Sequence, residues 1–200
     1  MNTIENLLLD SGLSWTFSKA LPYVAMILIG FLLVRWIKGK LNNFKKPISI
    51  FFKIVTFAVP FVIYFLFFPI YEGDFSNSSD RVAIGEYEEL KGKKLVVLTI
   101  PNCPFCYEAI GKIKKIKERV PLMEVDYIVC SENSSSTDFY RDEGQGVITV
   151  KLAKDAQKMS ALAKGSFPTF ILVDEKRNLQ TWSNDNFGVR AIDFIENYFQ

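Results

Sequence analysis

Two long apolar stretches constrain the first third of the chain more than any other feature. Residues 20–34 read ALPYVAMILIGFLLV and residues 54–71 read IVTFAVPFVIYFLFFPIY, without a charged residue in either. In lipid such a stretch satisfies its backbone only as a helix, and about 20 residues cross the hydrocarbon core. With flanking residues included, we expect a membrane anchor over 1–71 with transmembrane helices at about 15–37 and 50–71. A buried core helix is the alternative for the first stretch.

The loop between these stretches predicts their orientation. It reads RWIKGKLNNFKKP and carries five basic residues and no acidic one, whereas Glu72 and Asp74 follow the second stretch. Basic loops stay on the cytoplasmic side of a membrane. We therefore expect a two-pass protein of the inner (cytoplasmic) membrane, with its N-terminus and C-terminal domain on the extracytoplasmic side. Disulfides persist in that compartment.

Charge and composition exclude several classes of function. Residues 1–71 hold seven Lys or Arg and two acidic residues, which leaves 17 basic and 20 acidic residues for 72–200. A mildly acidic domain gives no reason to expect a nucleic-acid partner. The chain contains no histidine, which excludes Ser-His and Cys-His catalytic pairs and His-ligated zinc.

After a polar tether at 72–81, a domain over 82–200 alternates strand and helix patterns. Apolar, β-branched runs predict strands at 93–100, 122–130, 168–174 and 179–183. Helical spacing predicts helices at 104–120, within 147–165 and at 189–199. The polar stretch 131–146 is interpreted as an insertion, and EKRN at 175–178 as a hairpin. The order predicts an α/β fold, a mixed central sheet with helices on both faces.

The sequence PNCPFC places Cys103 and Cys106 where the first predicted strand meets its helix. Pro104 suits the first helical position. Free N–H groups and partial positive charge at a helix N-terminus favour a thiolate, so the pKa falls below the ~8.5 of free cysteine. We expect Cys103 to be the nucleophile and Cys106 the more buried resolving thiol. Cys130 is the third cysteine, so a Cys₄ metal site lacks its fourth ligand, and three thiolates with a carboxylate stay open.

VVLTIPNCPFC running into a helix, followed by GSFPTFILVD, resembles the thioredoxin superfamily, and most closely its membrane-anchored extracytoplasmic members in bacteria. The resemblance covers about 85–200 and implies a thioredoxin-like fold. It implies that Cys103 attacks a substrate disulfide, that Cys106 resolves the mixed disulfide, and that Pro168 faces the pair as a cis-proline. Substrate contacts are expected at Phe167, Pro168, Pro104 and Phe105, with the backbone of Phe167 pairing like a strand.

The resemblance also implies protein thiols and disulfides as substrates, a separate membrane or soluble redox partner to recharge the pair, and no metal or organic cofactor. Two positions differ from thioredoxin: Val97 replaces an acidic residue and Asn102 a tryptophan. Cys130 could be a third redox thiol or a core residue. Glu108, on the motif helix, could tune the thiolate or lie on the solvated surface.

We therefore expect a membrane-tethered extracytoplasmic thiol–disulfide oxidoreductase, with the reductase direction favoured. Two alternatives stay open. One is a thioredoxin-fold binding or chaperone-like module in which Cys103 and Cys106 form a static structural disulfide. The other is a metal carrier that uses Cys103, Cys106 and Cys130 as thiolate ligands.

Overall fold

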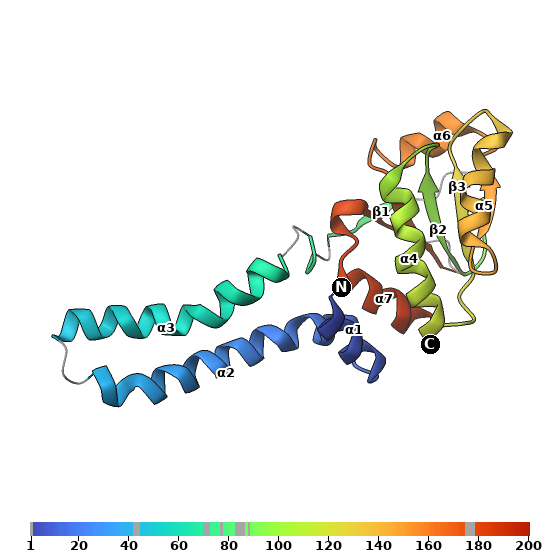
Figure 1. Cartoon of the computed structure of the whole chain (residues 1–200). Helices are drawn as coiled ribbons and strands as arrows, with labels where there is room; N and C mark the ends of the chain where they lie inside the picture. Colours follow the sequence, from blue (N-terminus) through green and yellow to red (C-terminus); the bar gives the residue numbers. More distant parts are fainter. Residues whose placement is uncertain are drawn as a thin grey trace. The chain divides into compact units, whose positions relative to one another are not determined.

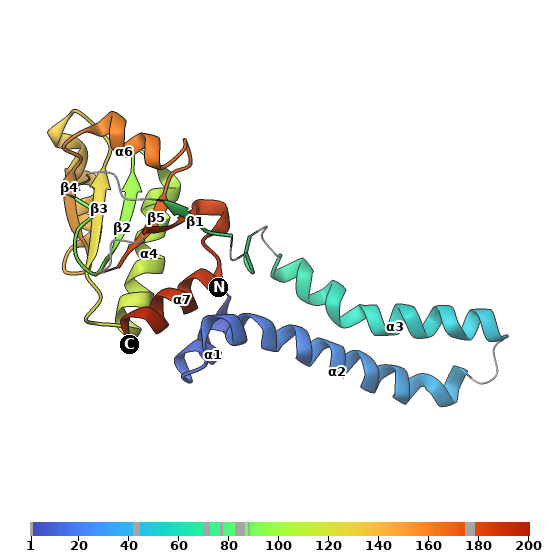
Figure 2. The same ribbon diagram turned by 180° about the vertical axis from the view of Figure 1, so that it is seen from behind.

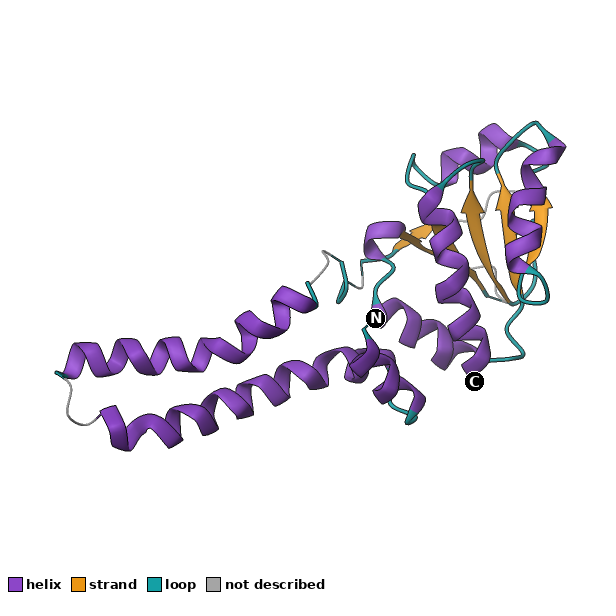
Figure 3. Ribbon diagram, viewed as in Figure 1, coloured by secondary structure: helices purple, strands orange, loops and turns teal. Residues whose placement is uncertain are grey.

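The computed structural model describes residues 2–41, 45–69, 73–76, 78–82, 87, 89–174 and 179–200. The chain divides into two compact units, Met1–Glu72 and Gly73–Gln200. The described part of the first unit is helical, and the second unit contains a sheet and its covering helices (Figure 3).

The first unit contains a helical hairpin preceded by a short helix. Helix α1 spans Thr3–Asp10, α2 Trp15–Leu41 and α3 Lys46–Phe67. The rings of Tyr23 and Tyr64 lie 5.9 Å apart and those of Phe31 and Phe57 5.2 Å apart. A later residue of α2 thus contacts an earlier residue of α3, so the two helices pack antiparallel. Gly30 permits the close approach, because a Cβ there would lie 3.0 Å from the Phe57 carbonyl oxygen.

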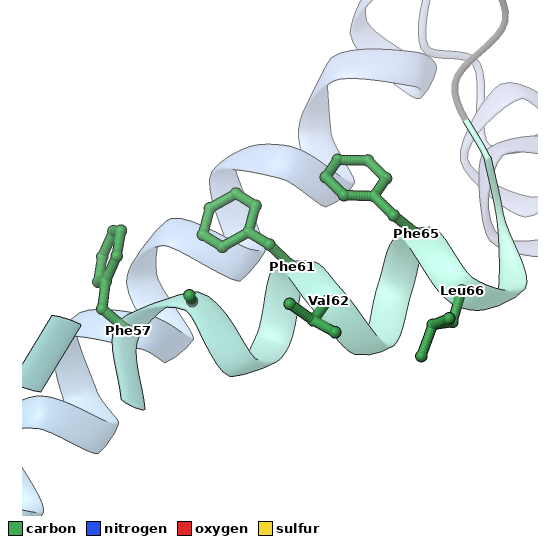
Figure 4. Close-up of a pocket in the computed structure, with 6 residues that line it drawn as sticks. Phe57, Phe61, Val62, Phe65 and Leu66 are labelled. Carbon is green, nitrogen blue, oxygen red and sulfur yellow. The ribbon is translucent and has the colours of Figure 1, made fainter. Parts of the chain in front are cut away.

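Both helices of the hairpin are long and apolar enough to cross a membrane. Large apolar side chains cover their outer surfaces, among them Leu28, Phe31, Leu32, Leu66 and Phe67, each more than half exposed. Figure 4 shows an apolar groove on α3, with its aromatic side chains in a row one helical turn apart. The helix bounds differ from the predicted 15–37 and 50–71: α2 continues to Leu41, and α3 begins at Lys46 and ends at Phe67.

The second unit is built on a six-stranded mixed sheet. Its strands are β1 (Asp80–Val82), β2 (Lys94–Thr99), β3 (Val125–Val129), β4 (Thr149–Leu152), β5 (Thr169–Val173) and β6 (Leu179–Ser183), in the order β1-β6-β5-β2-β3-β4. Strands β2, β3 and β4 are parallel to one another, whereas β5 is antiparallel to β2, β6 to β5 and β1 to β6. The predicted mixed sheet is confirmed.

Helices cover both faces of this sheet. Helix α4 (Pro104–Arg119) connects β2 to β3, α6 (Ala156–Leu162) precedes β5, and α7 (Val189–Phe199) closes the chain. Val96 and Leu98 belong to the core cluster that also contains Met159 of α6. Val97 and Tyr127 point to the opposite face. Helices α4 and α7 lie on that face (Figures 1 and 2). Alternation along a strand thus supplies two separate cores.

Three segments differ from their predicted structure. Part of the expected tether belongs to the second unit, because Asp80–Val82 forms β1 and the Val189 N–H donates to the Asp74 carbonyl at 2.9 Å. The insertion 131–146 contains a 3₁₀ turn (Ser134–Thr137) and helix α5 (Asp138–Gly144). The segment 147–165 contains strand β4 before its helix. The hairpin predicted at 175–178 lies outside the described residues.

Candidate active site at the N-terminus of α4

Cys103 lies at the N-cap of α4, four residues after β2 ends at Thr99. Pro104 occupies the first helical position, and the Cys103 carbonyl accepts the first helical hydrogen bond from the Tyr107 N–H at 3.1 Å. Asn102 reverses the chain before the helix in the left-handed region, at φ 56°. The strand-to-helix junction predicted from the sequence is therefore present.

The two cysteines of the motif form a disulfide, with their Cα atoms 5.2 Å apart. The Cys106 N–H donates to the Cys103 sulfur at 3.1 Å. Cys103 is 7% exposed and Cys106 is fully buried. Of the two motif cysteines only Cys103 keeps any exposed surface, so an incoming thiolate is expected to attack Cys103. After reduction the same N–H and the helix N-terminus would stabilise negative charge on the Cys103 sulfur.

Two buried tyrosines hold the backbone on either side of the disulfide. The Tyr127 hydroxyl, from β3, donates to the Cys106 carbonyl at 3.3 Å. The Tyr140 hydroxyl, from α5, donates to the Ile100 carbonyl at 2.6 Å. The rings of the two tyrosines pack together, with centroids 6.0 Å apart.

Both tyrosines are neutral hydrogen-bonding groups at physiological pH. Burial raises the pKa of Tyr127 far above its ordinary value, and burial also raises the pKa of Tyr140. Tyr127 pairs with Val97 in the β2–β3 ladder. Val97 stands at the position where thioredoxin has an acidic residue. Here the neighbouring Tyr127 reaches Cys106, and its hydroxyl is a phenol and not a carboxylic acid.

The residues predicted to contact substrate lie at two places. Pro104 and Phe105 are exposed at the start of α4, and Phe105 is 59% exposed. The peptide between Phe167 and Pro168 is cis, as the resemblance implied. Because Thr169 pairs with Leu98 near the end of β2, Pro168 lies at the sheet end from which the chain leads to Cys103. Substrate contact at these residues stays a prediction.

Cys130 lies at the same end of the sheet but points into the other core. It is a free, buried thiol in the cluster that contains Met159 and Ala163, and its N–H donates to the Thr99 carbonyl at 2.8 Å. Burial raises the pKa of the Cys130 thiol, and a hydrogen bond with Ser160 offsets part of this rise. This position favours a packing role. Glu108 is exposed on α4, so a tuning role for either residue stays a prediction.

The contrast between Cys103 and Cys130 predicts a large difference in alkylation. In reduced full-length protein at pH 7, iodoacetamide should modify Cys103 at least about tenfold faster than Cys130, although the two residues are 7% and 8% exposed. The thiolate is the form that reacts; the helix N-terminus favours it at Cys103, whereas burial raises the pKa of the Cys130 thiol. Mass spectrometry of peptides sampled over time measures both rates. In urea the two rates should converge. Equal rates in the folded protein would contradict this placement of the two thiols.

Tyr127 and Tyr140 are the site residues that the sequence did not predict. Tyr127 lies in a predicted strand. A phenol that is buried in a sheet needs a hydrogen-bond partner, and this need was the signal that could have indicated Tyr127. Tyr140 lies in the polar insertion beside Phe139, and an aromatic pair within a polar segment was its only signal. Within the described residues, no three Cys, Asp or Glu side chains gather as a metal site would require.

No protein-family model and no curated protein matches the sequence. Among solved structures, the chain is similar to a secreted Mycobacterium tuberculosis disulfide oxidoreductase homologous to E. coli DsbE, at 13% identity and TM-score 0.44, over 55% of this chain and 84% of that one. It is similar to the thioredoxin domain of a thiol-disulfide oxidoreductase from Bacteroides vulgatus, at 14% identity and TM-score 0.44, over 64% and 98%. It is also similar to a SCO1/SenC family lipoprotein from Bacillus anthracis, at 12% identity and TM-score 0.41, over 63% and 95%.

Proposed function

We propose that the protein is a membrane-tethered, extracytoplasmic thiol–disulfide oxidoreductase that exchanges disulfides with protein substrates through Cys103 and Cys106. One observation carries the proposal. The sulfur of Cys103, the less buried residue of the pair, caps a helix N-terminus and accepts a hydrogen bond from the Cys106 N–H, whereas Cys106 is fully buried. This asymmetry suits a nucleophile and a resolving thiol, because a low pKa and access both belong to the same sulfur.

In the reductase direction the Cys103 thiolate attacks one sulfur of a substrate disulfide. The substrate S–S bond breaks, a Cys103–substrate disulfide forms, and the first substrate sulfur leaves as a thiolate that takes up a proton. Cys106, after losing its proton, attacks the Cys103 sulfur and releases the second substrate thiol. Two electrons and two protons pass to the substrate, and the Cys103–Cys106 disulfide remains.

A dithiol partner must then reduce the Cys103–Cys106 disulfide before the next turnover. Residues 1–71 contain no cysteine, so the anchor cannot carry electrons by thiol exchange and the partner is a separate protein. We favour the reductase direction because membrane-tethered members of the superfamily often keep extracytoplasmic cysteines reduced. The hairpin of α2 and α3 is either an anchor alone or also the docking surface for this partner.

Two features of the first unit support the membrane location. Its two long helices expose large apolar side chains that would be costly in water. The basic residues between them favour a cytoplasmic loop, which places Gly73–Gln200 on the other side. Protein thiols and disulfides outside the cytoplasm are then the accessible substrates.

The test is a trapping experiment with the full chain in bacterial cells. Cys106→Ala should accumulate mixed disulfides through Cys103, because the resolving thiol is absent. These adducts should appear in the membrane fraction on non-reducing gels, disappear with dithiothreitol, and become accessible to protease when the outer membrane is opened. Mass spectrometry of the adducts identifies the partners.

The matched control is Cys103→Ala with Cys106 retained. It should give few adducts, because Cys106 is buried and cannot reach a substrate. Adducts of equal abundance in both variants would contradict the proposed roles. Absence of adducts from both would instead favour a static structural disulfide.

A further inference from the structure

We propose that Tyr140 is a positioning residue for disulfide exchange: its hydroxyl holds Cys103 in the geometry that stabilises the thiolate, and it thereby sets the redox potential of the pair. The inference rests on the proposed function and deepens it. It assigns a role to α5, the helix within the segment 131–146 that the sequence suggested was only an insertion.

The Tyr140 hydroxyl restrains the start of the loop before α4. It donates to the Ile100 carbonyl at 2.6 Å from a fully buried side chain. Ile100 precedes Pro101 and Asn102, and Asn102 has the left-handed φ of 56°. Asparagine adopts that region more readily than other residues with a side chain, and the hydrogen bond at Ile100 fixes the chain that enters it. Tyr140 thus restrains the backbone three residues before Cys103.

The restraint bears directly on the nucleophile. At the N-cap, the Cys103 sulfur lies 3.1 Å from the Cys106 nitrogen. In the reduced protein this contact becomes a hydrogen bond to a thiolate, which is stronger than one to a neutral sulfur and depends on alignment. If the loop relaxes, the sulfur moves away from the N–H groups of the first turn. The thiolate then loses stabilisation, and the reduced form of the pair becomes less stable relative to the disulfide.

Two buried phenols bond the backbone around the pair. Tyr127 of β3 donates to the Cys106 carbonyl and Tyr140 of α5 to the Ile100 carbonyl, and both are neutral because burial raises the pKa of each. Glu108 on α4 is exposed, and the Glu143 carboxylate of α5 accepts hydrogen bonds from Tyr107 and Lys114. Hydrogen-bond geometry at the helix N-terminus is therefore the contribution to the Cys103 thiolate that Tyr140 can change.

The test measures two properties of full-length protein in detergent. The midpoint of the Cys103–Cys106 couple is measured in glutathione buffers, and the pKa of Cys103 is measured from the pH dependence of its alkylation. In Tyr140→Phe the exchange equilibrium should move about tenfold toward the disulfide, which is about 30 mV more negative for a two-electron couple. The pKa of Cys103 should rise by about one unit, since one unit is the same tenfold factor.

Two matched variants remove a hydroxyl elsewhere. Tyr107→Phe removes an exposed hydroxyl that donates to Glu143 at 2.9 Å, and its midpoint should equal that of the wild type. Thr181→Val removes the hydroxyl of a buried residue on β6, which donates to the Asp80 carbonyl at 3.2 Å, and the exchange equilibrium should change less than about threefold. If Thr181→Val shifts the midpoint as much as Tyr140→Phe, general loosening of the second unit explains both and the inference is overturned.

A measurement on the wild type keeps the inference testable if Tyr140→Phe does not fold. The Cys106 N–H donates to the Cys103 sulfur at 3.1 Å, so while the loop is held in place this amide should exchange at least about a hundredfold slower than an open one. Unprotected exchange overturns the inference. If Tyr140→Phe has the same midpoint as the wild type, this inference alone is overturned. If the disulfide of the wild type shows no reversible midpoint, the proposed function is overturned as well.

Discussion

The Cys103→Ser variant is expected to reduce insulin disulfides at least about a thousandfold more slowly than the wild type, since loss of a covalent nucleophile leaves only binding and positioning effects. A serine hydroxyl at the N-cap can still accept the helix N–H groups, so the fold should survive. The hydroxyl does not ionise at neutral pH, and it cannot form the mixed disulfide. The rate is measured with full-length protein in detergent, with dithiothreitol as electron donor.

The same substitution at Cys130 provides the comparison. Cys130 is buried with α6 side chains and is not bonded to either motif cysteine. Cys130→Ser should therefore keep the wild-type rate within about twofold and lose some stability, because it places a hydroxyl among apolar neighbours. A Cys103→Ser variant that works at the wild-type rate would falsify the nucleophile assignment. Equal loss in both variants would assign Cys130 to the exchange.

The sequence predicts the central part of the fold because each central element carries its own signal. β2 is an apolar run bounded by Gly92 and Pro101, and α4 begins at a proline and has isoleucines at helical spacing. β2 is buried on both faces and α4 along one face, so local pattern and tertiary environment agree. The position of Cys103 at their junction follows from these two signals alone.

The edges of the sheet were not predicted because their stability is not local. β4 has alternating exposed and half-buried residues, and β1 contains only Asp80–Val82. Each pairs with one neighbour, β3 or β6 respectively. Short polar strands of this kind form because the neighbouring strand offers them an edge to pair with. The residue pattern of a three- or four-residue segment does not predict this pairing.

The tyrosine contacts at the site were missed for a related reason. Tyr140 is 37 residues from Cys103 in sequence, in a segment whose composition is that of a loop. Its burial depends on α5 packing near α4, and α5 is only seven residues long. Composition predicted an insertion here, but the hydrogen bond of Tyr140 to Ile100 depends on tertiary packing, which composition does not predict.

The second large effect is expected in stability, at Asp126 on β3. Its carboxylate lies 2.6 Å from the ammonium of Lys94 and 2.8 Å from that of Lys151. The Asp126 side chain is 8% exposed and that of Lys94 12%, whereas Lys151 is 46% exposed. Asp126→Ala should lower the free energy of unfolding by about 3 kcal/mol, because Lys94 then remains buried without its counter-charge.

An exposed ion pair of the same length provides the control for this prediction. Lys164 and Asp80 lie 2.7 Å apart with side chains 69% and 64% exposed, so Asp80→Ala should change the free energy of unfolding by less than about 0.5 kcal/mol. Urea denaturation of the full chain in detergent measures both variants. Trp15 and Trp36 are replaced by phenylalanine, so that the fluorescence of buried Trp182 reports the second unit.

A double variant separates the cost of an unpaired charge from the loss of an attraction. In Asp126→Leu/Lys94→Met both buried charges are absent, and Lys151 can turn toward water because it is already half exposed. Stability should return to within about 1.5 kcal/mol of the wild type, as it does when apolar side chains of similar volume replace a buried pair. If the double variant is as unstable as Asp126→Ala, the ion pair itself holds β2 to β3, and desolvation of Lys94 is not the cause.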